Sequence, residues 1–150
     1  MTDLIVETFR LNGRLLLAGD ELTRDLGLSS ARWQIIGALA DGPLPAAEIA
    51  RKMGLARQSV QRLVDVLAEE QIVAFTDNPS HRRAKLVHLT PRGSELLTEL
   101  TQRQAVWVNH LTQGVFESDI RSAVQVLSFL RERLETLSGK ERTNGNRRSH

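Results

Sequence analysis

Side chains able to contact base edges are concentrated in one short stretch, residues 56–71. Gln can pair with two atoms of adenine, Arg with two atoms of guanine, and Ser with a base or a phosphate. Apolar residues in this stretch recur at the i, i+3, i+4, i+7 spacing of a helix face packed on a core: Val60, Leu63, Val64 and Leu67. This spacing places the polar residues on the outer face and its flanks: Arg57, Gln58, Ser59, Gln61 and Arg62.

A shorter helix is predicted just before this one, over residues 46–53, where four apolar residues share a face: Ala46, Ile49, Ala50 and Met53. Gly54 can adopt the left-handed conformation that ends a helix, whereas Pro45 offers no side-chain cap at the start. Two helices joined through a glycine form a helix-turn-helix, whose second helix enters the major groove of DNA. The alternative is a pair of packed helices whose polar face serves solubility alone.

A basic hairpin is predicted after the second helix. Residues 72–75 and 84–89 are β-prone, and the turn residues between them, 76–83, end in Arg82 and Arg83, with Lys85 shortly after. In the second run Val87 and Leu89 share a face, and Leu44 is expected to add a third strand. Arg suits phosphates and the narrow minor groove, so the hairpin is interpreted as a wing. The alternative is that its charges protect an exposed strand edge.

Positive charge is concentrated on this predicted head. The 150-residue chain has a formal net charge of +2, and residues 51–92 hold eight basic and four acidic side chains, a local net charge of +4. Phosphate binding requires such a surface. The composition, 41% hydrophobic and 25% charged, is ordinary for one globular domain.

Residues 22–95 resemble the winged helix-turn-helix core of the multiple antibiotic resistance regulator (MarR) family of bacterial transcription factors. The resemblance is carried by Leu28-Ser29-Ser30-Ala31-Arg32-Trp33, by residues 56–65, by Arg82-Arg83-Ala84-Lys85, and by Val87, Leu89-Thr90 and Gly93. Four positions depart from the family pattern, and one of them is Pro45, which stands where a Ser or Thr often caps the first helix of the motif. Ser80 stands where the wing commonly has an acidic residue, and Phe75 and Thr76 stand where an Arg is common.

We expect the winged helix-turn-helix head to span about residues 28–92. One further helix is predicted before it and another within its first part. The first covers residues 2–24, with Asn12, Gly13 and Gly19 interrupting it. A short helix over residues 31–40, capped by Ser29 or Ser30, is expected to supply core residues: Trp33, Ile36, Leu39 and Ala40.

The C-terminal part, about residues 92–138, is expected to form two long amphipathic helices. The first follows the Thr90 cap, and the second starts at a Ser118 cap and ends at Ser138. A winged head folds without them, so we expect these helices and residues 2–24 to form a dimer surface, with a monomeric helical hairpin as the alternative. Residues 1–138 are one domain in this interpretation, and residues 139–150 are expected to be a disordered basic tail.

No enzyme chemistry is indicated. The chain has no cysteine, which excludes thiol nucleophiles and thiol redox sensing. Its four histidines are scattered without metal-ligand spacing, and no phosphate-binding glycine loop is present. We therefore expect no cofactor and no metal. No apolar run approaches the length of a membrane span, so a cytoplasmic protein is expected.

The sequence therefore predicts a mainly α fold with a small β-hairpin wing (α+β), in a homodimer that binds a palindromic operator in double-stranded DNA and acts as a repressor. Family resemblance implies release by a small molecule, often an aromatic acid, in a cleft near Trp33, although Trp33 itself is better suited to the core than to the cleft. The rival interpretation is a winged-helix module that binds protein, with weakened DNA binding.

Overall fold

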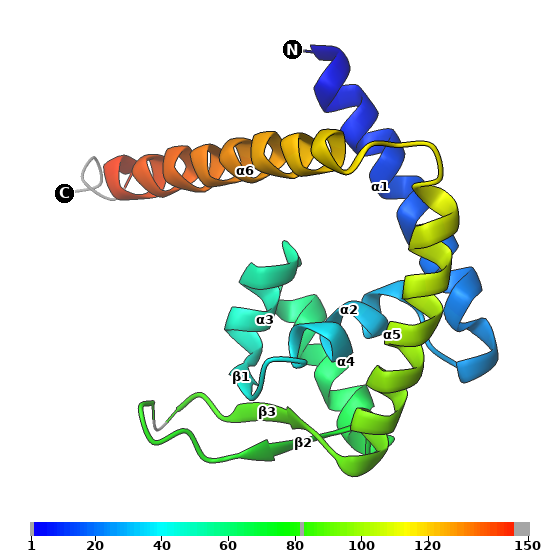
Figure 1. The fold of residues 1–150 in the computed structure, drawn as a ribbon. Helices are drawn as coiled ribbons and strands as arrows, with labels where there is room; N and C mark the ends of the chain where they lie inside the picture. Colours follow the sequence, from blue (N-terminus) through cyan, green and yellow to red (C-terminus); the bar gives the residue numbers. More distant parts are fainter. Residues whose placement is uncertain (1, 82, 146–150) are drawn as a thin grey trace. The chain divides into compact units, whose positions relative to one another are not determined.

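The structure, a computed structural model, describes residues 2–81 and 83–145, and for residues 138–145 it describes the backbone alone. The chain divides into two units, residues 1–107 and 108–150, which are described separately. The elements follow the order α1 (Thr2–Thr23), a 3-10 turn η1 (Arg24–Leu26), α2 (Ser30–Ala38), β1 (Leu44–Pro45), α3 (Ala46–Met53), α4 (Arg57–Glu69), β2 (Val73–Thr76), β3 (Leu86–Leu89), α5 (Pro91–Leu111) and α6 (Glu117–Gly145) (Figure 1). This confirms the predicted mainly α fold with a small antiparallel sheet.

Helix α1 is continuous, contrary to the predicted interruptions. Gly19 lies inside it, and a Cβ there would be 2.8 Å from the Cβ of Ser30 at the start of α2. The glycine therefore permits the close approach of two helices and does not break one. Asp20 Oδ1 accepts a hydrogen bond from the Ser30 amide at 2.6 Å, which fixes the same junction.

The N-terminus of α2 confirms one of the two predicted caps. The Ser29 hydroxyl accepts a hydrogen bond from the Arg32 amide at 3.3 Å. The helix ends at Ala38, two residues earlier than predicted, and Ala40 is exposed in the following turn. The expectation that Ala40 lies in the core is therefore wrong, and the fully buried Ile35 takes that place.

Helices α3 and α4 form the predicted helix-turn-helix. Gly54 between them has φ +65°, the left-handed conformation that ends α3, and Pro45 provides no capping side chain. Helix α4 ends at Glu69, two residues before the predicted end. Gln71 then adopts φ +59° and turns the chain toward the sheet.

The sheet has the strand order β1-β3-β2, and all neighbours are antiparallel. Leu44 pairs with Val87, which confirms the predicted third strand, and Val73 pairs with Leu89. Strand β3 begins at Leu86, later than predicted. The Ala84 amide instead donates to the His81 carbonyl at 3.0 Å, and Arg83 and Ala84 lie outside the strand.

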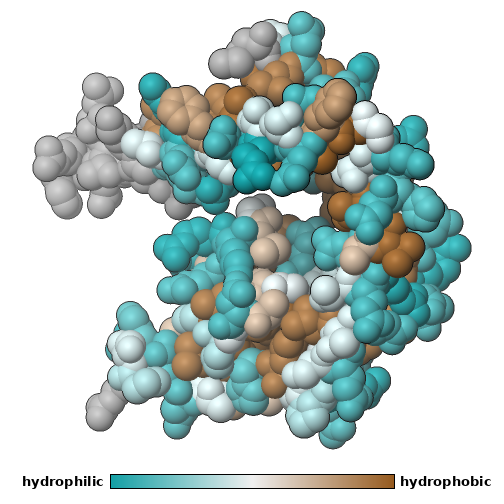
Figure 2. Space-filling view, viewed as in Figure 1, coloured by the Kyte–Doolittle hydropathy of each residue, from teal (hydrophilic) through white to brown (hydrophobic). Residues whose placement is uncertain are grey.

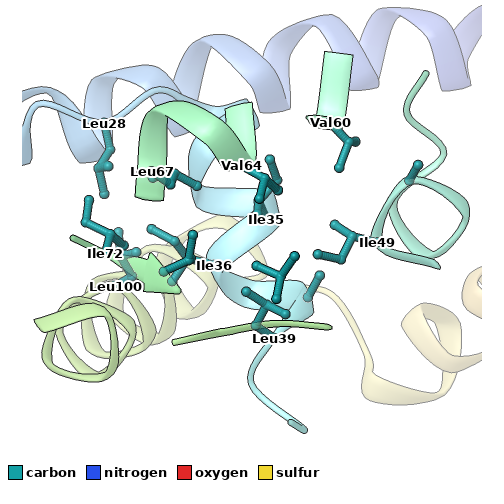
Figure 3. Close-up of a cluster of buried hydrophobic side chains, with 14 residues drawn as sticks. Leu28, Ile35, Ile36, Leu39, Ile49, Val60, Val64, Leu67, Ile72 and Leu100 are labelled. Atoms are coloured by element: carbon teal, nitrogen blue, oxygen red, sulfur yellow. The ribbon is translucent and has the colours of Figure 1, made fainter. Parts of the chain in front are cut away.

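One hydrophobic core joins α2, the helix-turn-helix, the sheet and α5 in the first unit (Figure 3). Helix α2 contributes Ile35 and Ile36, and the helix-turn-helix contributes Ile49, Val60, Val64 and Leu67, all of them fully buried. Leu100 is 1% exposed, so the N-terminal part of α5 packs on this core as well. The rotation of α4 about its own axis is consequently set by the residues it buries.

The second unit contains α6. This helix begins at Glu117, and the Phe116 carbonyl accepts from the Ile120 amide at 3.2 Å, so the predicted Ser118 cap is wrong. Its backbone continues to Gly145, beyond the predicted end at Ser138. A glycine inside a helix costs only about 1 kcal/mol relative to Ala, and the next residues, Lys140, Glu141 and Arg142, favour helix. The remainder of the tail, residues 146–150, lies outside the described residues.

Candidate nucleic-acid interface

The outer face of α4 carries every base-reading candidate predicted on this helix. Val60, Val64 and Leu67 are 0% exposed on the opposite side. This burial turns five side chains to solvent: Arg57, Gln58, Ser59, Gln61 and Arg62. Among the described residues, neither Arg57 nor Arg62 forms an ion pair. Their charges therefore remain available to an anionic partner.

The start of α4 is electrostatically suited to a phosphate. Ala56 occupies the N-cap position without a side-chain hydrogen bond, and the first turn contains no acidic residue. No side chain at this helix start caps the free backbone N–H groups. No acidic side chain offsets the positive end of the helix dipole there. Arg57 adds a full positive charge in the same turn.

The wing presents basic side chains on a loop built from local turns. The His81 amide donates to the Asn78 carbonyl at 3.1 Å, and the Ser80 amide donates to Asn78 Oδ1 at 3.0 Å. Arg83 and Lys85 follow these turns and are exposed. The third predicted wing residue, Arg82, lies outside the described residues.

Two of the basic residues counted in the local charge stabilise the head itself. Lys52 Nζ lies 3.0 Å from Asp41 Oδ2 and donates to the Ala38 carbonyl at 3.1 Å. Arg92 donates to the Glu70 carbonyl at 3.0 Å. The positive surface is therefore narrower than the sequence count indicated, and it is centred on the start of α4 and the wing.

Asp65 is a candidate site residue that the sequence interpretation did not include. Its Oδ1 accepts a hydrogen bond from Gln61 Nε2 at 2.9 Å on the exposed side of α4. The i, i+4 spacing of an amide and a carboxylate was the available signal, because such residues are neighbours on a helix surface.

Trp33, the candidate for ligand binding, is half-buried and packs against the core. Its ring lies beside Gly19, where a Cβ would be 3.5 Å from Cε3. This contact joins α2 to α1. Within the described residues, no group of three or more metal-ligating side chains is present, and no helix is long and apolar enough to cross a membrane.

A helix-turn-helix followed by a basic hairpin, on a three-stranded sheet, defines a winged helix-turn-helix protein. The family model described as MarR family matches residues 26–84. An uncharacterized protein of Mycobacterium tuberculosis is 33% identical over 112 residues, 75% of this chain and 78% of that protein. The HTH-type transcriptional regulator TcaR of Staphylococcus aureus is 26% identical over 121 residues, 79% of this chain and 80% of TcaR.

Solved structures show the same fold. CouR from Rhodococcus jostii RHA1, in its crystal structure with p-coumaroyl-CoA, superposes with a TM-score of 0.79 at 23% identity, covering 86% of this chain and 92% of CouR. The chain belongs to the MarR family of transcriptional regulators. The family is one of regulators and not of enzymes.

Proposed function

We propose that the protein regulates transcription by binding a palindromic operator in double-stranded DNA as a homodimer, and that it acts as a repressor in the cytoplasm. The observation that carries this proposal is the orientation of α4 about its own axis. Burial of Val60, Val64 and Leu67 turns the polar side of the helix outward. The same head presents exposed Arg83 and Lys85 on its wing.

Each side chain has a role that follows from its chemistry. Gln58, Gln61 and Arg62 read base edges in the major groove, because Gln matches adenine and Arg matches guanine. Arg57 and Ser59, at the start of α4, contact a base or hold a phosphate. The wing residues contact the flanking backbone or the minor groove: Arg82, Arg83 and Lys85.

Exposed apolar side chains on the outer helices support the homodimer. In the first unit, α1 exposes 73% of Phe9 and 62% of Leu17. In the second unit, α6 exposes 57% of Phe129 and 58% of Leu137. Figure 2 shows brown, hydrophobic patches among the side chains of α6. Exposed apolar surface of this extent indicates a binding partner, and a second copy of the chain places two α4 helices in major grooves about 34 Å apart.

Selection of randomised duplexes by the purified protein, followed by sequencing, tests this function. A palindrome with half-sites about ten base pairs apart is expected, because a two-fold dimer reads each half-site once per helical turn. A steep fall of affinity with salt is expected for random duplexes as well. No enriched sequence together with a flat salt dependence would contradict the proposal.

The rival function, a module that binds protein, is favoured by one feature. The wing holds Phe75, which is 38% exposed, and Ser80 at positions where a DNA-reading wing would gain from charge. The salt titration separates the two functions, because only DNA binding releases counterions from phosphates.

We further propose that a small aromatic acid releases the protein from DNA. CouR was crystallised with p-coumaroyl-CoA, which supports the idea for a protein of this fold. Such a ligand can act only through unequal affinity for the DNA-bound and free spacings of the two heads. Thermal-shift screening of phenolic and aromatic acids is expected to find a stabilising compound that also releases DNA. A screen without such a compound would refute this part alone.

A further inference from the structure

Gln61 and Asp65 form a hydrogen-bonded pair on the outer side of α4. Gln61 Nε2 donates to Asp65 Oδ1 at 2.9 Å, and both side chains are exposed. The pair does not contribute to the core, which α4 contacts through Val60, Val64 and Leu67. The pair can therefore affect the hydrogen-bonding groups that α4 offers to a binding partner.

The chemistry of the pair determines which way the Gln61 amide faces. A carboxylate accepts hydrogen bonds and cannot donate, so the amide nitrogen, and not the amide oxygen, must face Asp65. One N–H of Gln61 is then occupied. The remaining N–H and Oε1 are one donor and one acceptor in a known orientation, which is the set that pairs with N7 and N6 of adenine.

We propose that Asp65 is a positioning residue for base reading: it holds the Gln61 amide in the orientation that recognises one base pair of the operator. The inference rests on the proposed function. Without Asp65, the amide rotates among several orientations and must be ordered when DNA binds. Ordering one long side chain reduces binding by about two- to tenfold, so Asp65→Ala is expected to reduce discrimination at that base pair by the same factor.

Two substitutions at this position separate the hydrogen bond from the charge. Asp65→Ala and Asp65→Asn both remove a negative charge, which strengthens binding to all duplexes alike. The side-chain amide introduced by Asp65→Asn keeps an oxygen that can accept from Gln61, whereas the methyl group introduced by Asp65→Ala does not. Base discrimination is therefore expected to fall most in Asp65→Ala and less in Asp65→Asn, because the introduced amide can also donate to Gln61 Oε1 and so favours the reading orientation only in part.

The DNA experiment uses the duplex selected by the full-length wild-type chain and all its single-base variants. Gln61→Ala first identifies the base pair that Gln61 reads. Asp65→Ala is expected to lose discrimination at that same base pair, and Gln61→Ala/Asp65→Ala is expected to lose no more than Gln61→Ala alone. The inference is overturned if Asp65→Ala keeps the wild-type discrimination there, or if Asp65→Asn loses as much as Asp65→Ala. A changed preference only at another base pair would show that Asp65 reads a base directly, which also overturns the inference.

A second experiment needs no DNA. In the ¹⁵N NMR spectrum of the free protein, the side-chain NH₂ signals of Gln61 are identified by their loss in Gln61→Ala. Asp65→Ala is expected to move these signals toward the position of a solvated amide, and Asp65→Asn is expected to move them less. Signals unmoved in Asp65→Ala would show that the hydrogen bond does not hold the amide, and would refute the inference. A wild-type protein that selects no DNA sequence would instead refute the proposed function.

Discussion

Arg103 on α5 contacts Asp25 in η1 with both of its terminal nitrogens. Nη1 lies 2.6 Å from Oδ1 and Nη2 lies 2.8 Å from Oδ2. The same guanidinium donates to the Leu22 carbonyl at 3.0 Å and to Glu99 Oε1 at 2.5 Å. A planar guanidinium suits such two-point contacts. The residue therefore ties α5 to the C-terminal end of α1 within the first unit.

This pair predicts acid sensitivity of folding. The hydrogen bond from Arg103 lowers the pKa of Asp25 below its ordinary value, although burial opposes the effect. A carboxyl group whose pKa is lowered in the folded state contributes its full stabilisation of the fold at a pH above the ordinary Asp pKa of about 3.9. This stabilisation is lost as the pH falls through the lowered pKa. Asp25→Asn is therefore expected to be less stable than wild type near neutral pH and equally stable in strong acid.

Urea unfolding at a fixed protein concentration, repeated along the acid range, measures this difference. Arg103→Lys is the second variant, because Lys keeps the charge but cannot form the two-point contact. It is expected to reproduce part of the loss. An Asp25→Asn protein with the same unfolding profile as wild type at every pH would contradict the prediction.

The surroundings of Gly93 predict a large loss of folding stability when a single methyl group is added at this position. A Cβ at this position would overlap the Ile72 carbonyl oxygen, which belongs to the backbone and cannot rotate away. The Ile72 carbonyl also accepts from the Thr90 amide at 3.1 Å. Gly93→Ala is expected to reduce the free energy of unfolding by about 1–3 kcal/mol, the usual cost of overpacking.

A matched control for Gly93 is available in α2. Gly37 is also helical, but a Cβ there would meet no atom within 4 Å. Gly37→Ala is expected to raise the free energy of unfolding by about 0.5–1 kcal/mol, because it removes the entropic cost of a helical glycine. Denaturant melts of the two variants should shift in opposite directions. Equal shifts would show that the contact with Ile72 is not the cause.

Base-reading and phosphate-binding side chains are expected to differ in their effects on DNA affinity. Arg62→Ala or Gln58→Ala should cost about 1–3 kcal/mol at one base position and relax the preference there. Arg83→Ala should weaken binding to all DNA sequences alike. It should also reduce the slope of log affinity against log salt concentration by about one unit. Competition binding with single-base variants of the selected duplex measures both effects. An unaltered site preference in both α4 variants would refute the assignment of reading to this helix.

The exposed apolar side of α1 predicts a substitution that dissociates the proposed homodimer. Phe9 is 73% exposed within the chain. Burying a Phe side chain contributes about 1.5–3 kcal/mol, and a two-fold interface contains each substitution twice. Phe9→Glu is expected to weaken the dimer by about 3–6 kcal/mol and yield monomers in sedimentation experiments.

The control for Phe9 lies on the polar side of the same helix. Arg14 follows Glu7 and Arg10, which form an ion pair on that side. Arg14→Glu changes the charge by more than Phe9→Glu does, yet it is expected to leave the dimer intact. If both variants, or neither, became monomeric, an interface through the apolar side of α1 would be refuted.

Local patterns in the sequence predicted the helix-turn-helix with close boundaries. The bounds of α3 were correct, and Gly54 adopts the left-handed conformation expected of it. The side of α4 that faces the core was also predicted, because Val60, Val64 and Leu67 recur at helical spacing and therefore lie on one side of the helix. The exposed positions of Gln58 and Arg62 follow from the same periodicity.

Features that depend on distant segments were not predicted. The sequence predicts a helix interruption at Gly19, and only the packing of α1 on α2 shows that this glycine permits close contact with Ser30. Lys52 was counted with the DNA-binding charge, whereas the fold brings Asp41 and the Ala38 carbonyl within its reach.

The sequence by itself determined the elements of the head and the polar side of α4, because residues a few positions apart decide helix periodicity, turns and caps. The tertiary structure alone decided which glycines admit a neighbouring backbone and which charges remain exposed. The physical reason is that close approach and charge pairing depend on distances between segments remote in the chain, and those distances exist only once the core has packed.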